Sequence, residues 1–515
     1  MRYHLQRIRT DVPAASPARP QPETPPLATA TVTTTSTPAV GEPAPTGHPI
    51  GFWFIFTGEL AERASFYGMK AVLLLYLIEV FAYKRSDASS IVHLYVAACY
   101  LTPLIGGLLA DLFLNKYWTI VAFAVPYVIG QFLVGLSNEY LMFGALALLS
   151  FGSGVIKPNI STLMGMTYDQ QRPGQVALRN KAFTWFYVAI NLGSFLSTLV
   201  CPFLRDYFGG ALDPVTNKRT DPQAGYFAAF MFPAVLMSCA LVCFALGKRY
   251  YAVEKLGYLK WGQPPEPEQE TRAEKIKVVT QILGLFILVM FFWAIFDQHA
   301  STWTLFANDY LDLTISAPNV TRDRPYVDFF GSWVTYTLAP DQIQAVNPLL
   351  IVIFAPLVSI LFARLGTAGY PVRATNKMIL GFLITSLAMG IHAYAGYLAV
   401  QPDGTVVKVT VWWQVLAYFA ITIAEILISV TGLELAFTAA PQSMKGFITS
   451  LWLLMVFMAN FFINTPVSRL YPSQEEGLHF ASPVTYFGML SVAMLVVTLA
   501  FVFVAQHFNR NQLKA

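Results

Sequence analysis

The sequence predicts an all-α membrane protein whose twelve transmembrane helices form two six-helix bundles. Of the 515 residues, 55% are hydrophobic and only 12% are charged, which excludes a water-soluble globular protein. Apolar stretches of roughly the 20 residues that a helix needs to cross a hydrocarbon core recur along the chain. One long polar break, over 248–275, divides these stretches into six and six.

The two ends of the chain are polar. Residues 1–50 are rich in proline, threonine and alanine and cannot bury enough apolar surface to fold, so we expect a disordered tail. Residues 508–515 form a second, shorter tail. Lysine and arginine are more frequent in the connections on the side of these tails than on the other side. By the positive-inside rule we expect both termini to be cytoplasmic, in a multi-pass protein of the cell (inner) membrane.

The apolar stretches give the expected helices in chain order. A first bundle covers 51–247 and a second covers 276–507, with 248–275 as a cytoplasmic linker between them. Residues 313–340 are expected to form an outward loop with a short re-entrant or interfacial piece. The helices are predicted over 51–82, 88–113, 117–136, 140–166, 179–204, 224–247, 276–311, 341–364, 376–400, 411–439, 445–470 and 482–507.

One stripe of the first helix is charged and aromatic. Its members recur every three or four residues, which places them on one face directed into the bundle. Two carboxylates beside one guanidinium predict that a proton balances the charge, and the alternative is a static network of salt bridges between helices. The stripe consists of Glu59, Glu62, Arg63, Phe66, Tyr67 and Lys70.

The second and fourth helices carry a histidine and a lysine at mid-span. His93 and Tyr100 share a face, and the histidine is a candidate for proton uptake, unless it is a satisfied core group. In Lys157-Pro158-Asn159 the proline removes a backbone donor, which predicts a broken helix that lines a cavity. The alternative is a kinked helix whose lysine reaches the membrane surface.

The seventh and tenth helices carry acids at mid-span. Trp293, Phe296 and Asp297 share a face, and the aspartate is a candidate gate or proton site, with a protonated core residue as the alternative. Glu425 lies deep in the tenth helix, four residues before Ser429. An ionisable group at this depth is a candidate functional residue because its burial is costly.

These charges have opposite signs in the two halves. The cations Arg63 and Lys157 belong to the first bundle, and the acids Asp297 and Glu425 belong to the second. A zwitterion can bridge them, with its carboxylate at the cations and its ammonium at Glu425. An extended dipeptide, about 7 Å between its ends, has a fitting length. Such a clamp contacts backbone termini, so it predicts tolerance of many side chains.

Motifs throughout 51–507 resemble those of one known family. The segment Gly107–Lys116 resembles the short loop of the major facilitator superfamily, whose two halves rock around a midplane site. Further motifs are similar to those of the proton-dependent oligopeptide transporter family, also called the POT or PTR2 family. They are Glu59–Gly68, Phe151–Asn159, Phe186–Gly193, Phe292–Gln298, Gln344–Pro348 and Ala424–Glu434.

The resemblance implies a proton-coupled symporter that imports di- and tripeptides by alternating access. It implies that the peptide carboxylate binds Arg63 and Lys157, and that the amino end binds Glu425, Asn159 and Asn347. The implied pocket also contains Tyr67, Tyr100, Asn191, Trp293, Ser429 and Trp452.

The resemblance also implies residues for proton coupling and gating. The implied gates are Lys70 with Asp297 and Arg85 with Asp309. Phe66 stands where the family usually has a tyrosine, which bears on substrate preference. Proton coupling is implied for Glu59, Glu62, Arg63, His93 and Asp297.

Other functions are alternatives to this one. A family member for nitrate or a modified amino acid is the second hypothesis, although Glu425 would repel a simple anion. A non-transporting receptor or an enzyme is the third, but no H-E-x-x-H, G-x-S-x-G or P-loop pattern occurs. All four cysteines lie in apolar segments, so we expect packed thiols and no metal site. We expect no cofactor apart from the proton gradient, no nucleic-acid partner, and a monomer that functions in the lipid bilayer.

Overall fold

The computed structural model describes residues 47–213, 219–254, 272–321, 324–370, 372–439, 445–472 and 482–512. Residues 1–46, expected to be part of a disordered tail, lie outside this part of the chain, as does most of the expected linker. Each of the twelve predicted stretches is helical, with bounds that differ by several residues.

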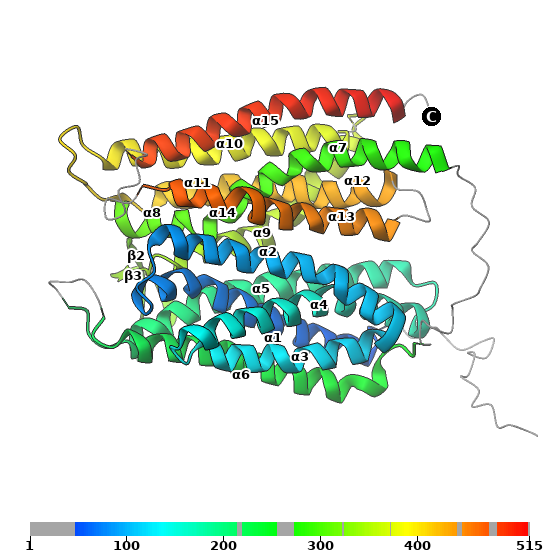
Figure 1. The fold of residues 1–515 in the computed structure, drawn as a ribbon, viewed down its shortest axis with the longest axis horizontal. Helices are drawn as coiled ribbons and strands as arrows, with labels where there is room; N and C mark the ends of the chain where they lie inside the picture. The colour runs from blue at the N-terminus through cyan, green and yellow to red at the C-terminus, as the bar shows by residue number, and fades with distance from the viewer. Residues whose placement is uncertain are drawn as a thin grey trace, which may run out of the picture. The chain divides into compact units, whose positions relative to one another are not determined.

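The first six predicted helices form one bundle (Figure 1). Helix α1 packs against α5 and α6, and α4 packs against α2 and α3. Two helices begin at caps that the sequence encodes: the side chains of Asn138 and Asp221 accept hydrogen bonds from backbone N–H groups in the first turns of α4 and α6. The bounds are α1 Ile50–Glu79, α2 Arg85–Leu109, α3 Asn115–Val134, α4 Glu139–Gln171, α5 Val176–Phe208 and α6 Pro222–Leu246.

The remaining helices form the second bundle. Helix α10 packs against α15 and α11, and α13 packs against α7 and, across the bundles, against α2. The bounds are α7 Arg272–Phe296, α8 Thr302–Tyr310, α9 Val346–Thr367, α10 Ala374–Ala399, α11 Trp412–Glu425, α12 Thr431–Ala439, α13 Lys445–Met458, α14 Thr465–Val467 and α15 Pro483–Gln512.

Three predicted spans of this bundle are each divided by a turn that is not α-helical. A 3-10 turn over Asp297–Ala300 separates α7 from α8. π-Helical turns over Ile426–Val430 and Ala459–Asn464 separate α11 from α12 and α13 from α14. Such turns free backbone groups and occur often at functional sites. All three adjoin polar residues that belong to the candidate site.

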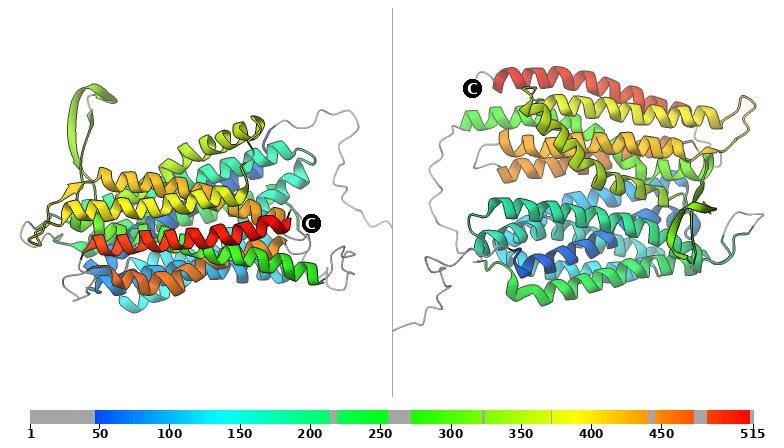
Figure 2. Two further views of the ribbon diagram at one scale, coloured as in Figure 1. Left: turned by 90° about the horizontal axis from the view of Figure 1, so that it is seen from above. Right: turned by 180° about the vertical axis from the view of Figure 1, so that it is seen from behind.

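The expected re-entrant or interfacial piece within 313–340 is wrong. Strands β2 (Thr314–Thr321) and β3 (Arg324–Thr337) instead pair antiparallel as a hairpin, which projects from one end of the bundles (Figure 2). The segment contains several β-branched and aromatic residues, which favour strands. Two further short strands, β1 (Leu311–Asp312) and β4 (Val409–Thr410), pair in parallel at the same end. We call this end the hairpin side, and the end at which α1 begins and α15 ends the terminal side.

Eleven helical segments within the described ranges are long and apolar enough to cross a membrane. Helix α1 is the predicted span that is not among them. It is 30 residues long, but Glu59, Glu62, Arg63 and Lys70 lower its apolar character. The expected count of twelve spans therefore depends on α1, whose charges are directed into the bundle.

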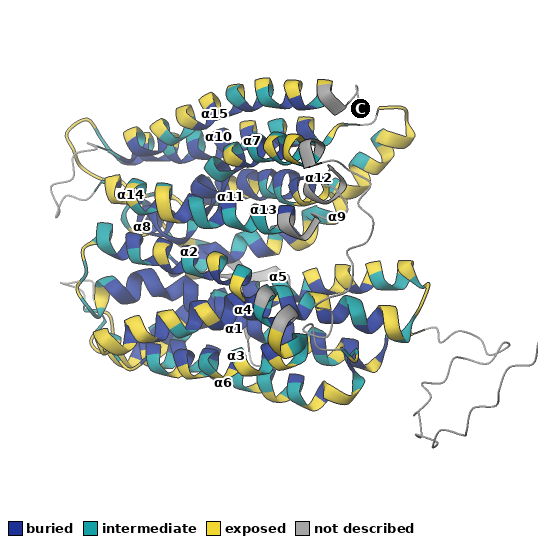
Figure 3. Cartoon of the chain, turned by 45° about the vertical axis from the view of Figure 1, so that its right-hand side comes forward, coloured by how far each residue is buried: buried dark blue, intermediate teal, exposed yellow. Residues whose placement is uncertain are grey.

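Exposed residues lie on the outward faces of the helices, and the faces between helices are buried (Figure 3). Many of the exposed residues are large and apolar. Leu357 of α9 and Phe503 of α15 are 53% and 72% exposed. A continuous apolar exterior of this kind fits contact with lipid. The expectation that all four cysteines pack in the core is wrong for Cys239, which is exposed, whereas Cys99 and Cys201 are buried.

Close packing of α5 on α1 depends on Gly193. A Cβ at this position would lie 2.5 Å from the backbone oxygen of Leu60, which cannot move without shifting α1. We expect Gly193→Ala to lower the free energy of unfolding by about 1–3 kcal/mol, measured by thermal unfolding in detergent. Gly144→Ala on α4 is the control, because a Cβ there meets nothing within 4 Å. An unchanged stability of Gly193→Ala would contradict this account of the α1–α5 contact.

Candidate functional site

The predicted charged stripe of α1 is buried. Arg63 Nε lies 3.2 Å from Glu59 Oε1, and its Nη2 contacts Glu62 Oε2. All three side chains are at most 3% exposed. Ser153 of α4 donates a hydrogen bond of 3.3 Å to Glu62. One guanidinium thus contacts both carboxylates within a single helix, which is not the network between helices that formed the alternative.

Lys157 adds a second cation beside this cluster. Its Nζ lies 4.6 Å from the ring centre of Phe66 and 4.7 Å from that of Tyr100. The ammonium is within electrostatic range of Glu59 and Glu62 but forms no ion pair within 4 Å among the described residues. Two acids and two bases balance, so charge alone does not require a proton here. The lysine is a partly exposed cation without a directly bound anion.

The expected break in the fourth helix is wrong. Helix α4 continues through Pro158 to Gln171, because Pro158 removes one donor while the remaining helical bonds hold. Asn159 was expected to bind the amino end of the peptide, together with Glu425 and Asn347. Asn159 is 1% exposed, and its amide donates to the backbone oxygens of Val155 and Gly106. Asn159 therefore joins α4 to α2.

Glu425 and Asn347 are adjacent in the second bundle. Asn347 Nδ2 donates to Glu425 Oε2 at 2.9 Å and to the hydroxyl of Thr422 at 3.0 Å. Glu425 is the last residue of α11 and is followed by the π-helical turn. Both side chains are partly exposed. The carboxylate is thus oriented by an amide and retains acceptor capacity for a donor.

His93 and Asp297 are linked through Asn460, a residue absent from the sequence predictions. Asn460 Nδ2 donates to Asp297 Oδ2 at 2.6 Å, and Asn460 Oδ1 lies 3.0 Å from His93 Nδ1. The other ring nitrogen of His93 lies 2.8 Å from the hydroxyl of Ser301. These buried groups connect α2 of the first bundle to the second bundle. The signal in the sequence was a pair of asparagines, Asn460 and Asn464, inside an apolar span.

The remaining predicted pocket residues have different kinds of contact. Trp293 and Trp452 lie together, with their ring centres 6.4 Å apart. Asn191 and Ser429 donate hydrogen bonds to the backbone of their own helices. The Tyr67 ring contacts Phe66, and Tyr67 is within electrostatic range of Arg63 and, across the bundles, of Glu425 and Asp297.

One of the two predicted gate pairs forms an ion pair in the described structure, and the other does not. Arg85 of α2 lies 2.5 Å from Asp309 of α8, in a partly buried ion pair on the hairpin side. Lys70 and Asp297 are close enough to interact electrostatically, but no ion pair within 4 Å joins them in the described part of the chain.

Another ion pair joins the bundles on the hairpin side and was not predicted. Arg205 of α5 lies 2.5 Å from Asp341, with a second contact of 3.2 Å, and the Asp341 side chain is fully buried. The predicted span 179–204 ended one residue before Arg205, so the arginine was assigned to a loop. Nearby, Gln344 donates to the backbone oxygen of Ala71 at 3.4 Å. Polar contacts therefore close the hairpin side between the two bundles.

Two helical bundles with buried charges between them and polar contacts that close one end are typical of membrane carriers, whose two halves rock around a midplane site. A model of the family described as PTR2, POT family, matches residues 117–258, 261–324 and 326–476. The chain therefore belongs to the POT family, as the resemblance of its motifs implied. The POT family is a family of transporters, which agrees with the prediction that the protein is not an enzyme.

Individual relatives agree with this assignment. The chain is 32% identical over 421 residues to solute carrier family 15 member 1 of Homo sapiens, covering 71% of this chain and 55% of the relative. It is 31% identical over 387 residues to solute carrier family 15 member 2 of Danio rerio, covering 67% and 49%. The chain thus spans about half the length of the curated relatives it matches.

Two solved structures share the fold. The crystal structure of the POT family transporter PepTSo has a TM-score of 0.71 and 26% identity, covering 90% of this chain and 99% of that one. A mutant of a peptide transporter POT in complex with alafosfalin has a TM-score of 0.72 and 25% identity, covering 90% and 96%. These similarities establish the major facilitator type of fold with two bundles.

Proposed function

We propose that the protein is a symporter that imports di- and tripeptides together with protons by alternating access. The observation that carries this proposal is that charges of opposite sign lie within electrostatic range of Tyr67: Arg63 of its own helix, and Glu425 and Asp297 of the other bundle. A zwitterion that contacts both signs draws the bundles together. The similarity to a solved peptide transporter supports a peptide as this zwitterion.

Lys157 is the proposed first contact of the peptide carboxylate. It has no carboxylate within ion-pair distance among the described residues, and two aromatic rings hold its ammonium. Arg63 is already engaged by Glu59 and Glu62. Protonation of either glutamate would release part of the guanidinium for the same carboxylate. Proton binding and peptide binding would then favour each other.

Glu425 is the proposed contact of the peptide ammonium, and Asn347 is the proposed positioning residue. The Asn347 amide holds one carboxylate oxygen, which leaves the carboxylate oriented and able to accept further hydrogen bonds. A simple anion such as nitrate would be repelled by this carboxylate. We therefore propose a peptide, and not nitrate, as the substrate.

The chain of Ser301, His93, Asn460 and Asp297 is the proposed site of proton uptake. Protonation of His93 turns the ring nitrogen beside Ser301 from an acceptor into a donor, so the hydroxyl must reorient. These four hydrogen-bonded residues belong to both bundles. A change in their hydrogen bonds therefore alters the contacts that close the hairpin side. One proton driven by about 100 mV and one pH unit supplies about 2.3 and 1.4 kcal/mol, enough for several hundredfold accumulation.

The orientation in the membrane is also proposed. The excess of lysine and arginine in the connections on the terminal side supports a cytoplasmic terminal side and an external hairpin side. The two bundles would then lie over 51–247 and 276–507, with cytoplasmic segments 1–50, 248–275 and 508–515. We propose the cell (inner) membrane as the location and a single chain as the functional unit.

Transport by the purified protein tests the proposal. We expect proteoliposomes with an inward proton gradient to accumulate a labelled dipeptide above its external concentration, and expect no accumulation without the gradient. Competition with di-, tri- and tetrapeptides and with nitrate identifies the substrate. Accumulation that is independent of the gradient would refute proton coupling, and competition by nitrate but not by peptides would refute the substrate.

His93→Gln tests the proposed proton site. Glutamine retains hydrogen-bonding capacity but does not titrate, so we expect uptake driven by the proton gradient to fall at least about tenfold. Exchange of labelled for unlabelled peptide without a gradient should persist, because the peptide contacts are unchanged. His507→Gln is the control, since His507 is exposed on α15. Gradient-driven uptake by His93→Gln at the unsubstituted level would exclude His93 from coupling.

A further inference from the structure

A seam of polar contacts on the hairpin side joins α2 of the first bundle to the chain that follows α13 in the second. Its members on α2 are Asp87, Ser90 and His93, which are three residues apart. His93 contacts Asn460, and the other two contact Arg469. The two partners therefore run in opposite directions along the seam, with Arg469 at its outer end and Asn460 at its inner end.

Arg469 makes two contacts with α2. Its Nε donates to the Ser90 hydroxyl at 2.8 Å, and its Nη2 lies 3.1 Å from Asp87 Oδ1. The ion pair with Asp87 is exposed, so it contributes about 1 kcal/mol or less. The contact with Ser90 is stronger, because this hydroxyl is buried and also lies 3.0 Å from the backbone oxygen of Thr465. Arg469 thus holds the outer end of α2 against the second bundle.

His93 lies directly behind these contacts. Its ring is fully buried, three residues further along α2 than Ser90. A proton from the hairpin side can reach the ring only through water that enters between the bundles, and the outer end of the seam separates the ring from that water. The charged or titratable groups near the ring are Asp297, Lys70 and His299.

We infer that Arg469 gates the access of protons from the hairpin side to His93. The inference rests on the proposed role of His93 in proton uptake. Arg469 neither binds the peptide nor carries the proton. It closes the outer end of the seam, and water reaches the His93 ring only while the arginine is released from Ser90 and Asp87.

Modification by diethyl pyrocarbonate, which acylates a histidine ring that solvent reaches, tests this inference on the full-length protein in detergent. Mass spectrometry of proteolytic fragments gives the rate at each histidine. We expect Arg469→Gln to accelerate the modification of His93 at least about threefold, because a neutral side chain loses the ion pair and weakens the bond to Ser90. Arg469→Lys should give an intermediate rate, since an ammonium keeps the charge but lacks the planar fork that makes both contacts.

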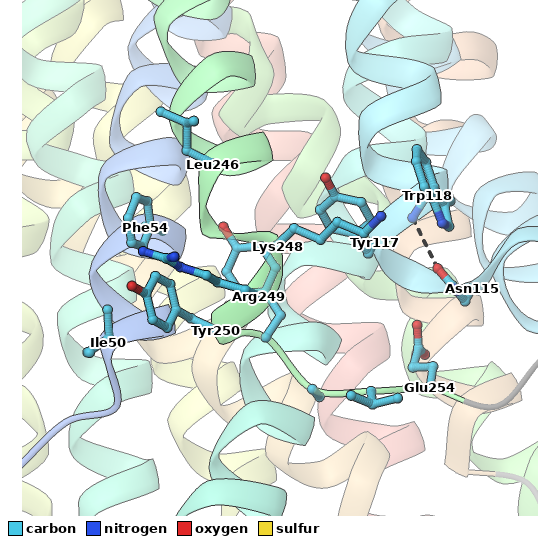
Figure 4. A pocket seen from close by; sticks show the side chains of 13 residues that line it. Ile50, Phe54, Asn115, Tyr117, Trp118, Leu246, Lys248, Arg249, Tyr250 and Glu254 are labelled. Atoms are coloured by element: carbon cyan, nitrogen blue, oxygen red, sulfur yellow. Dashed lines mark hydrogen bonds between the residues drawn. The ribbon is translucent and has the colours of Figure 1, made fainter. Parts of the chain in front are cut away.

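Two controls separate loss of the seam from other effects. His392 is buried among aromatic rings in α10, and its modification rate should stay unchanged in Arg469→Gln. Lys248→Gln removes the same charge from the first bundle. Lys248 Nζ lies 4.3 Å from the ring centre of Trp118 in a cavity on the terminal side (Figure 4). We expect this variant to leave the rate at His93 within about twofold of the unsubstituted protein.

An unchanged rate at His93 in Arg469→Gln would overturn the inference. Equal acceleration at His93 and His392 would also overturn it, because the whole protein would then be loosened. So would equal acceleration by Lys248→Gln, because the rate would then follow net charge. The modification is measured without transport. The two proposals therefore fail separately, the gate by the modification rate and the coupling by uptake in His93→Gln.

Discussion

Glu425→Gln is expected to weaken the apparent affinity for a dipeptide by about 10- to 100-fold. The substitution keeps the shape of the side chain and its contact with Asn347 but removes the charge that the ammonium of the peptide needs. A hydrogen bond to a charged group contributes about 1.5–3 kcal/mol, which gives this range. The measurement is the concentration dependence of dipeptide uptake in proteoliposomes.

A modified substrate separates loss of the ammonium contact from general damage. The unsubstituted protein should discriminate strongly against an N-acetylated dipeptide. Glu425→Gln should discriminate little, because glutamine has no negative charge to attract the ammonium that acetylation removes. Glu434→Gln is the matched control, since Glu434 follows in α12 and is exposed. Full discrimination by Glu425→Gln would show that another group recognises the amino end.

Asp341→Asn is expected to open the hairpin side. The substitution leaves Asp206 of the same helix, 2.9 Å from Arg205 Nε, as the remaining carboxylate partner of the buried arginine. Breaking a buried ion pair costs up to about 3–5 kcal/mol. That cost is relieved when the bundles separate and water reaches the arginine. Cys201 is buried near this pair and can report the change. We expect its labelling by a maleimide to accelerate at least about tenfold in a protein whose other cysteines have been replaced.

Two further variants serve as controls for this labelling measurement. Arg205→Met with Asp341→Leu removes both charges, and should label more slowly than Asp341→Asn because an apolar pair of similar volume leaves no buried charge. Asp169→Asn disrupts an exposed ion pair with Arg179 within the first bundle, and should leave labelling unchanged. Slow labelling of Cys201 in Asp341→Asn would mean that other contacts keep the hairpin side closed.

Helix positions were predictable because the bilayer imposes a length and an apolar composition on every span. The alternation of apolar stretches and polar breaks placed all twelve helical stretches within a few residues. The buried stripe on α1 was predictable for the same reason, since charged side chains in a span must face inward. The β2–β3 hairpin was not predicted, because outside the bilayer no such constraint acts on the chain.

Contacts between residues that lie far apart in the sequence were harder to predict than the positions of the helices. Asn159 fits the sequence pattern of a substrate contact, but the structure commits its amide to α2. Arg205 and Asp341 lie far apart in the sequence at the ends of spans, where boundaries are uncertain by the few residues that matter. Nothing local distinguishes them from loop residues. Their contact arises only when α5 and the segment before α9 meet on the hairpin side.

The amino-acid sequence was sufficient to predict that the chain crosses a membrane many times, that it divides into two halves, and which buried charges it carries. Each of these follows from the cost of placing polar groups in lipid, which acts on every residue separately. Which of these charges contact one another became known from the folded arrangement of the helices. Arg63 contacts two acids, Lys157 has no ion pair within 4 Å among the described residues, and Asn460 joins His93 to Asp297. Such partners depend on how helices pack across both bundles, and no local pattern encodes that arrangement.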